Sequence, residues 1–179
     1  SGLFWMSIES ADPYLLDKRK TRLGFERAAA TYDASAVLQR EIGERLLERL
    51  DLIRMQPETV LDLGCGTGFV TENLLKRYKK ARVIGIDLAQ AMVQKTCQKG
   101  GWFRKPQGVC ADASALPLRE QSTDMLLSNL MLQWCTDLPQ VFGELVQVLR
   151  PDGLLMFSTF GPWRLGARLT NYCGRRQAR

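Results

Sequence analysis

Apolar and polar residues follow two different patterns along this chain, and the change comes near Pro57. Over residues 13–52 apolar side chains recur every three or four positions among charged ones, which is typical of amphipathic helices. Ser35 is expected to begin a second helix, since serine is a good N-cap, and Pro57 to end the helical pattern. We therefore predict a helical N-terminal cap over residues 1–56.

From Thr59 onward, short apolar runs alternate with amphipathic segments. The predicted strands are Thr59–Leu63, Ala81–Ile86, Gln107–Ala111, Thr123–Ser128 and Leu154–Thr159. The predicted helices are Thr67–Lys80, Ala89–Lys99 and Leu138–Leu149, and residues 150–153 are predicted to form a turn. Nearly continuous apolar strands joined by helices indicate an α/β fold over residues 57–160, with a Rossmann-like, doubly wound and mainly parallel sheet.

The alternating pattern stops after Phe160, and residues 161–179 are interpreted as a basic tail. Leu165 and Leu169 could share one face of a short helix, but such a helix would be marginal alone, and disorder is the favoured interpretation. The tail holds five arginines and no acid, whereas the first 160 residues carry 20 basic and 19 acidic side chains. Because the net charge of +6 comes mainly from the tail, no nucleic-acid groove is expected across the domain.

Composition narrows the classes of site and compartment. The five cysteines are widely spaced with no C-x-x-C pair, which argues against a disulfide scaffold or a zinc site and favours the cytoplasm. Histidine, the commonest metal ligand and general base, is absent, so we expect no metal site. No apolar run approaches the roughly 20 residues that span a bilayer, and the first residues do not resemble a signal peptide, so we expect no membrane partner.

A glycine-rich turn after the first predicted strand is the strongest candidate for a binding site. Glycines at such a place let the backbone turn tightly and approach a ligand at the start of a helix, although an ordinary tight turn remains an alternative. An acid two residues before the first glycine would repel a pyrophosphate but suit the ammonium group of S-adenosylmethionine (SAM). The segment's candidate cofactor residues are Asp62, Gly64, Cys65, Gly66, Thr67 and Gly68.

Two more acids follow the next strands. Asp87 ends the second strand, where a carboxylate can accept from both ribose hydroxyls; capping the next helix is the alternative role. Asp112 and Ala113 follow the third strand, where Asp112 could accept from the adenine amino group or serve only as a turn residue. Leu88 and Met92 could line the base. Carboxylates at three successive strand ends predict one cofactor cleft at the topological switch point.

The segment 62–68, Asp87, Asp112 and Asp124 together resemble the motif set of class I SAM-dependent methyltransferases over Thr59–Phe160. Residues 25–33 with 38–40, and residues 128–135, further resemble the malonyl-acyl carrier protein O-methyltransferase of biotin synthesis. That resemblance implies methylation of the free carboxylate of a malonyl thioester on acyl carrier protein. It also implies two more strands, the last of the usual seven, which this chain is expected to lack. A malonyl carboxylate is already ionised, which agrees with the lack of histidine.

The same resemblance implies roles for five side chains. Tyr32 would close over the cofactor, Asn129 and Leu130 would flank its methionine part, and Gln133 and Trp134 would wall the reaction centre. Alternatively, Tyr32 joins two helices and Trp134 anchors the core. Rival functions are methylation of another small molecule such as a quinone precursor, a methyltransferase-like assembly factor of the respiratory chain, and a nicotinamide oxidoreductase, which Asp62 and the G-x-G-x-G spacing oppose.

Overall fold

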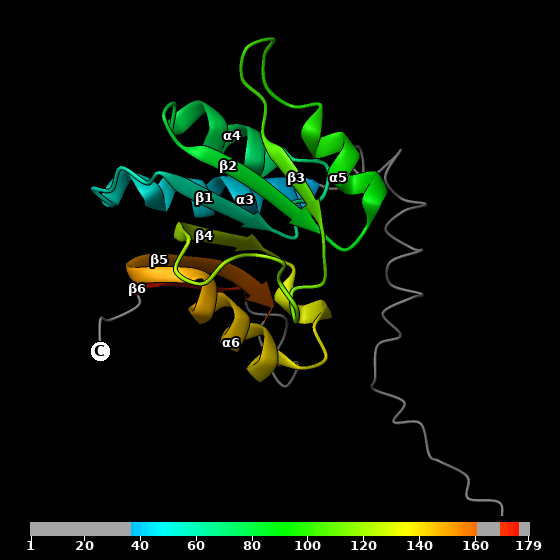
Figure 1. Cartoon of the computed structure of the whole chain (residues 1–179), viewed down its shortest axis with the longest axis vertical. Helices are drawn as coiled ribbons and strands as arrows, with labels where there is room; N and C mark the ends of the chain where they lie inside the picture. Colours follow the sequence, from blue (N-terminus) through cyan, green and yellow to red (C-terminus); the bar gives the residue numbers. More distant parts are fainter. Residues whose placement is uncertain (1–36, 161–168, 176–179) are drawn as a thin grey trace, which may run out of the picture.

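The computed structural model describes residues 37–160 and 169–175, which form a six-stranded sheet with helices on both faces (Figure 1). The strands are β1 Thr59–Leu63, β2 Arg82–Asp87, β3 Gln107–Cys110, β4 Thr123–Asn129, β5 Leu149–Phe160 and β6 Leu169–Arg175. The helices are α3 Val37–Glu48, α4 Phe69–Arg77, α5 Gln90–Cys97 and α6 Leu138–Val148, with short 3-10 turns η1 Arg49–Leu52 and η2 Leu132–Trp134. None of these helices is both long and apolar enough to cross a bilayer.

The strand order is β3-β2-β1-β4-β5-β6, and the first five strands run parallel. From β1 the chain continues to β2 and β3 on one side of the sheet. It then returns, so that β4 lies on the other side of β1. This reversal between β1 and β4 is the switch point at which open α/β sheets bind ligands, beyond the carboxyl ends of the strands. The predicted Rossmann-like, mainly parallel α/β fold is confirmed.

Alternate residues of the central strands supply two apolar layers. Val60, Met125 and Leu127 pack with α3 and α4 on one face, and Leu61, Leu63 and Leu126 pack with α6 on the other. Most of these strand side chains have essentially no exposed surface, as expected for parallel strands covered on both faces.

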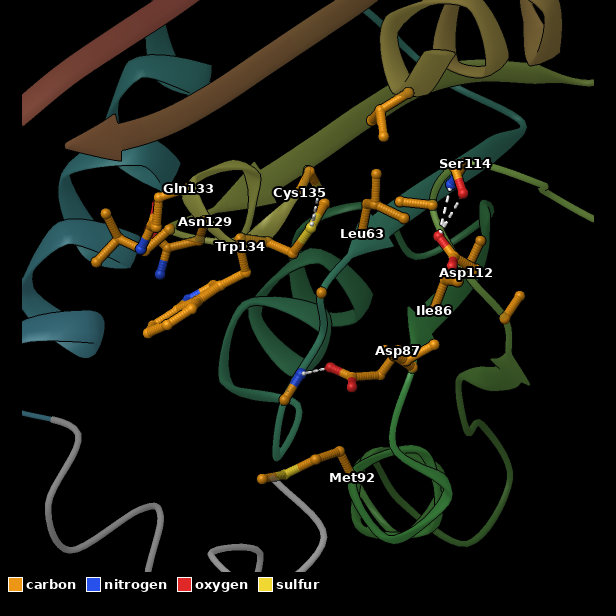
Figure 2. A pocket seen from close by; sticks show the side chains of 18 of the residues that line it. Leu63, Ile86, Asp87, Met92, Asp112, Ser114, Asn129, Gln133, Trp134 and Cys135 are labelled. Carbon is orange, nitrogen blue, oxygen red and sulfur yellow. Dashed lines mark hydrogen bonds between the residues drawn. The ribbon is translucent and has the colours of Figure 1, made fainter. Parts of the chain in front are cut away.

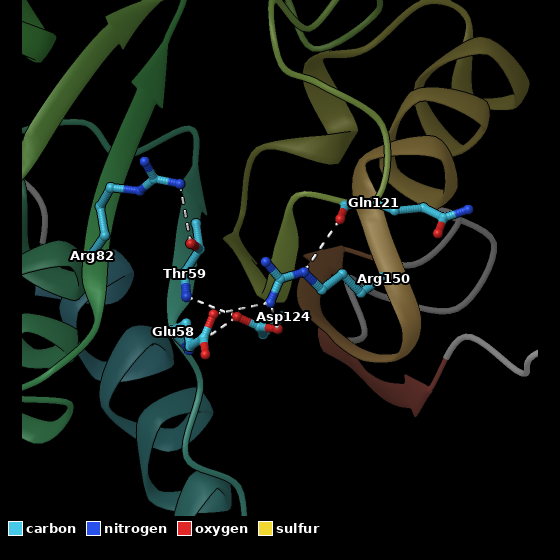
Figure 3. A network of polar contacts seen from close by, with 6 residues as sticks. All are labelled: Glu58, Thr59, Arg82, Gln121, Asp124 and Arg150. Atoms are coloured by element: carbon cyan, nitrogen blue, oxygen red, sulfur yellow. Dashed lines mark hydrogen bonds and ion pairs between the residues drawn. The ribbon is translucent and has the colours of Figure 1, made fainter.

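A polar network joins β1, β4 and β5 at their amino ends, at the edge of the sheet opposite the carboxyl ends of the strands (Figure 3). One carboxylate oxygen of Asp124 accepts from the backbone amides of Glu58 and Thr59 at 2.9 and 2.8 Å. The other accepts from Arg150 at 2.8 Å. Hydrogen bonds to a charged acceptor are stronger than neutral ones, so Asp124 fixes β1 against its neighbours in the sheet.

Two sequence predictions about β5 and the tail are wrong. Residues 150–153 belong to β5 as an irregular insertion rather than a separate turn: between the pairs Thr123↔Leu149 and Met125↔Leu154, β4 has one residue and β5 has four. Residues 169–175 form the antiparallel strand β6, paired with β5 from Phe160↔Leu169 to Leu154↔Arg175, rather than a disordered tail or a short helix. Pairing with the free edge of β5, the preceding strand, decides this structure more than the local pattern of residues 169–175 does.

Candidate functional site

A cleft opens at the carboxyl ends of the strands, on both sides of the switch point (Figure 2). Acidic side chains from the β2 and β3 ends lie on one side, and neutral side chains that follow β4 lie on the other. Leu63, Ile86 and Met92 add apolar wall between them. The lining includes the predicted residues Gly64, Gly66, Asp87, Leu88, Met92, Asp112, Ala113, Asn129, Leu130, Gln133 and Trp134.

The glycine loop between β1 and α4 takes left-handed backbone conformations. Gly64, Gly66 and Gly68 have φ of 76°, 53° and 91°, a region that glycine enters without penalty. A side chain at Gly64 would also place its Cβ 2.5 Å from the Cβ of Met131, which lines the cleft. The loop therefore requires glycine for conformation and for space, and it brings backbone to the cleft floor as predicted.

Asp62 is buried beneath this loop and does not line the main cleft. It lies at 1% exposure and accepts a 2.5 Å hydrogen bond from the Thr71 hydroxyl of α4. Burial raises the pKa of Asp62 to about 7, the hydrogen bond from Thr71 lowers it in part, and the negative charge of Asp87 adds a smaller upward shift. Asp62 instead lines a smaller adjoining pocket, together with Cys65 and Thr67 of the glycine loop and Asn129 after β4. Because its pKa is near neutral, the Asp62 carboxyl can lose its proton when a cation binds beside it.

Asp87 links the glycine loop to α5. One carboxylate oxygen accepts from the Gly66 amide at 2.9 Å and the other from the Ala89 amide at 3.0 Å. Burial raises the pKa of Asp87, and these backbone amides counteract the shift. The N-cap of α5 is Ala89 rather than Asp87, so the capping alternative is wrong in its strict form, although Asp87 does hold the entry to that helix. Its side chain lies at the cleft wall with acceptor capacity for a ligand.

Asp112 has the turn role that was considered for it and also lines the cleft. Its Oδ1 accepts from the amide and hydroxyl of Ser114 at 2.9 and 2.7 Å, which fixes the carboxylate at the end of β3. Asp87 and Asp112 therefore stand at neighbouring strand ends on one wall (Figure 2). Two acceptors above an apolar wall suit a ligand that combines hydroxyl and amino groups with a flat ring.

The opposite wall is held by a network between β4, β5 and α3. Asn129 donates to the Gln39 carbonyl at 2.8 Å and accepts from the Ser158 hydroxyl at 2.7 Å. Leu130 has φ of 52°, which is uncommon for a residue with a side chain, and its amide donates to the Ser158 carbonyl and hydroxyl at 3.0 and 3.1 Å. Ser158 thus stabilises a strained backbone at the cleft, a feature that clusters at functional sites.

Gln133 and Trp134 come next on this wall. The Gln133 side chain accepts from the Thr159 hydroxyl at 3.4 Å. Trp134 is 45% exposed, so the interpretation of this side chain as a core anchor is wrong. Both lie at the neutral side of the cleft, beside Cys135 (Figure 2). This side presents no carboxylate near Gln133 and Trp134 other than Asp137 within the described part of the lining.

Some predicted residues lie elsewhere, and others were missed. Cys65 and Thr67 line only the smaller pocket, and Tyr32 lies outside the described residues. The sequence did not point to Gln39 of α3, which lines both pockets, or to Ser158. Gln39 belongs to a helix remote in sequence from the glycine loop, and its backbone carbonyl accepts from Asn129 at the site. Residues 37–160 and 169–175 contain no group of three or more His, Cys, Asp or Glu side chains able to hold a metal.

Comparisons with known proteins extend this description. The chain is 51% identical over 159 residues to the malonyl-[acyl-carrier protein] O-methyltransferase of Methylovorus sp., covering 86% of this chain and 54% of the relative. The enzyme of the same name from Halorhodospira halophila is 50% identical over 155 residues, covering 87% and 52%. The chain thus spans about half the length of the curated relatives it matches.

Solved structures agree on the architecture. Phosphoethanolamine N-methyltransferase 1 of Haemonchus contortus, solved with phosphoethanolamine and S-adenosylhomocysteine, matches 85% of this chain and 36% of its own with a TM-score of 0.62 at 18% identity. At this identity the match shows the fold alone. The family model described as a methyltransferase domain matches residues 61–157, from the centre of β1 through most of β5, and includes the glycine loop and all three acids. The chain therefore belongs to the methyltransferase domain family.

Proposed function

We propose that this chain binds SAM in the cleft between the two walls. The observation that carries the proposal is the convergence of Asp87 and Asp112 on one wall beside a loop whose glycines admit close approach. The cofactor fits this donor and acceptor set: Asp87 would accept from the ribose hydroxyls and Asp112 from the adenine amino group. Leu88 and Met92 would contact the adenine ring, because both line the same wall. Asp62 and Asn129 would lie toward the methionine part, since both line the smaller adjoining pocket.

We further propose that the acceptor is the free carboxylate of a malonyl group carried on acyl carrier protein. The relatives that are about 50% identical carry this activity in their names, and the resemblance of residues 128–135 points the same way. SAM supplies an electrophilic methyl group on a sulfonium. The chain's part is to orient the cofactor and to exclude water at the neutral wall of Gln133 and Trp134. A carboxylate arrives ionised, so no general base is needed there.

The compartment follows from the same proposal. Within the described residues, Cys65, Cys97, Cys110 and Cys135 form no disulfide with one another, which agrees with a reducing cytoplasm. What supports acyl carrier protein as the partner is the relatives' names together with the open mouth of the cleft.

Calorimetry tests the cofactor: SAM and S-adenosylhomocysteine should bind, and NAD should not. Binding of NAD without SAM would refute the central proposal. For the acceptor, radiolabelled SAM is offered with malonyl-acyl carrier protein or its methyl ester, and only the free acid should take the label. The assay uses the chain alone and a fusion to the remaining half of the Methylovorus relative, since the chain spans about half of it. We expect transfer to rise in the fusion with SAM affinity little changed; labelling of a phenol or quinone instead would refute the substrate.

A further inference from the structure

Helix α6 is tied to the loop that follows β3 by two hydrogen bonds from its Gln140 and Glu144 side chains. The Glu144 carboxylate accepts from the backbone amide of Leu116 at 2.7 Å. The Gln140 side-chain amide donates to the Ser114 carbonyl at 3.2 Å. The Leu116 side chain, only 8% exposed, packs in the apolar layer that contains Leu145 of α6. The loop is therefore fixed to α6 by both its backbone and its core contact.

This loop is the one that carries Asp112. The amides of Ser114 and Ala115 both bond back to Asp112, the first to its carboxylate at 2.9 Å and the second to its carbonyl at 3.0 Å. The next amide along the chain, that of Leu116, bonds to Glu144 instead. Three consecutive amides of one short turn are thus bonded, two of them to Asp112 on the cleft wall and the third to the Glu144 carboxylate on α6.

Glu144 is unusual for its helix. It is the only charged residue among the 11 residues of α6. Its carboxylate is half-buried and is turned toward the loop. A carboxylate that accepts from a backbone amide forms a charge-assisted hydrogen bond, which is shorter and stronger than a neutral one. Such a bond holds the Leu116 backbone, and with it the turn, at a fixed place against α6.

We propose that Glu144 is a positioning residue for cofactor recognition, which acts by holding the 112–116 turn so that the Asp112 carboxylate is aimed at the adenine amino group. This inference rests on the proposed function, because it assigns Asp112 to the adenine end of SAM. It adds that the choice of adenine over other bases depends on a side chain that does not touch the ligand. Glu144 lies behind the cleft wall, so it is not among the residues that could contact the ligand.

The test measures the Kd of S-adenosylhomocysteine and of its inosine analogue, in which a carbonyl oxygen replaces the 6-amino group. In Glu144→Ala the Leu116 amide loses its acceptor, and we expect the Kd of S-adenosylhomocysteine to rise about tenfold, while that of the inosine form changes less than about threefold. Glu144→Gln keeps an acceptor oxygen and should restore most of the affinity. The matched control is Gln147→Ala on the same helix, whose side chain bonds only to the exposed Glu120, and it should bind like the parent.

An Asp112→Ala background separates positioning from simple destabilisation. If Glu144 acts through Asp112, Glu144→Ala should weaken binding no further in that background. The positioning role is overturned if Glu144→Ala leaves the preference for adenine over inosine unchanged, or if its effect persists in full without Asp112, whatever it does to the melting temperature. If the parent chain itself fails to bind S-adenosylhomocysteine, the proposed cofactor is overturned together with this inference. If only the positioning role fails, the parent chain still binds S-adenosylhomocysteine, so the two failures are distinguishable.

Discussion

Replacing Asp62 by asparagine should remove a large part of the pH dependence of stability. The carboxyl is 1% exposed, and its pKa is raised from 3.8 to about 7, mainly by burial. Between those two values the folded state holds a proton that the unfolded chain has lost. The free energy of unfolding therefore falls as pH rises from about 4 to 7. At about 1.4 kcal/mol per pKa unit, the whole change is on the order of 4 kcal/mol.

The measurement is urea unfolding of the parent and Asp62→Asn at several pH values from 5 to 8. Most of the window lies in this range, so the parent should lose on the order of 2–3 kcal/mol between its ends through Asp62. The variant should lack that share of the slope, because asparagine does not titrate yet can still accept from Thr71. Glu41→Gln, which removes an exposed carboxylate, is the matched control and should keep the parent's slope. Equal slopes in the parent and Asp62→Asn would refute the assigned proton.

Three other changes give equally definite expectations. Asp87→Ala should leave the chain folded and weaken SAM binding by about 1–3 kcal/mol in calorimetry, since ligand hydroxyls would lose their acceptor; normal binding would mean that Asp87 serves only the backbone. Gly64→Ala should abolish SAM binding and lower the melting temperature, because its Cβ would collide with Met131, and a variant that binds normally would contradict the required φ. Asp124→Ala should lower the free energy of unfolding in urea by about 2–4 kcal/mol, since two backbone amides lose a charged partner. The control is Arg45→Ala, which breaks only the exposed ion pair with Glu41 and should cost under about 1 kcal/mol. Equal costs would argue against the network.

The sequence was informative where structure depends on local pattern. Apolar runs located β1 to β4 to within a residue or two, and the parallel connections then required the strand ends to meet at one edge. That is why Asp87 and Asp112 could be assigned to one cleft before their geometry was known. The glycine loop was recognisable because its conformations, with φ from 53° to 91°, restrict which residues can occupy it.

What the sequence did not reveal depends on contacts outside the local residue pattern. β6 forms because the edge of β5 is available for pairing, although its own residues show little strand pattern. Ser158 and Gln39 reach the site through hydrogen bonds to Asn129, across separations of 29 and 90 residues. Asp62 was expected to face the ligand directly, but its position beneath the loop depends on the packing of α4 against β1.

The strand order divides the cleft between two separate segments of the chain. The β2 and β3 ends supply the acidic wall, while the segment after β4 supplies Gln133 and Trp134. The turn that carries Asp112 is bonded to Gln140 and Glu144 of α6, whereas Gln133 and Trp134 lie on η2, before that helix. Over evolution, substitutions at Gln133 and Trp134 can therefore alter which acceptor is accommodated while the hydrogen bonds of Asp87 and Asp112 remain. Related proteins could thus keep the same methyl donor while their acceptors differ. The reversal of strand order between β1 and β4 would separate the side of the cleft that stays the same from the side that changes.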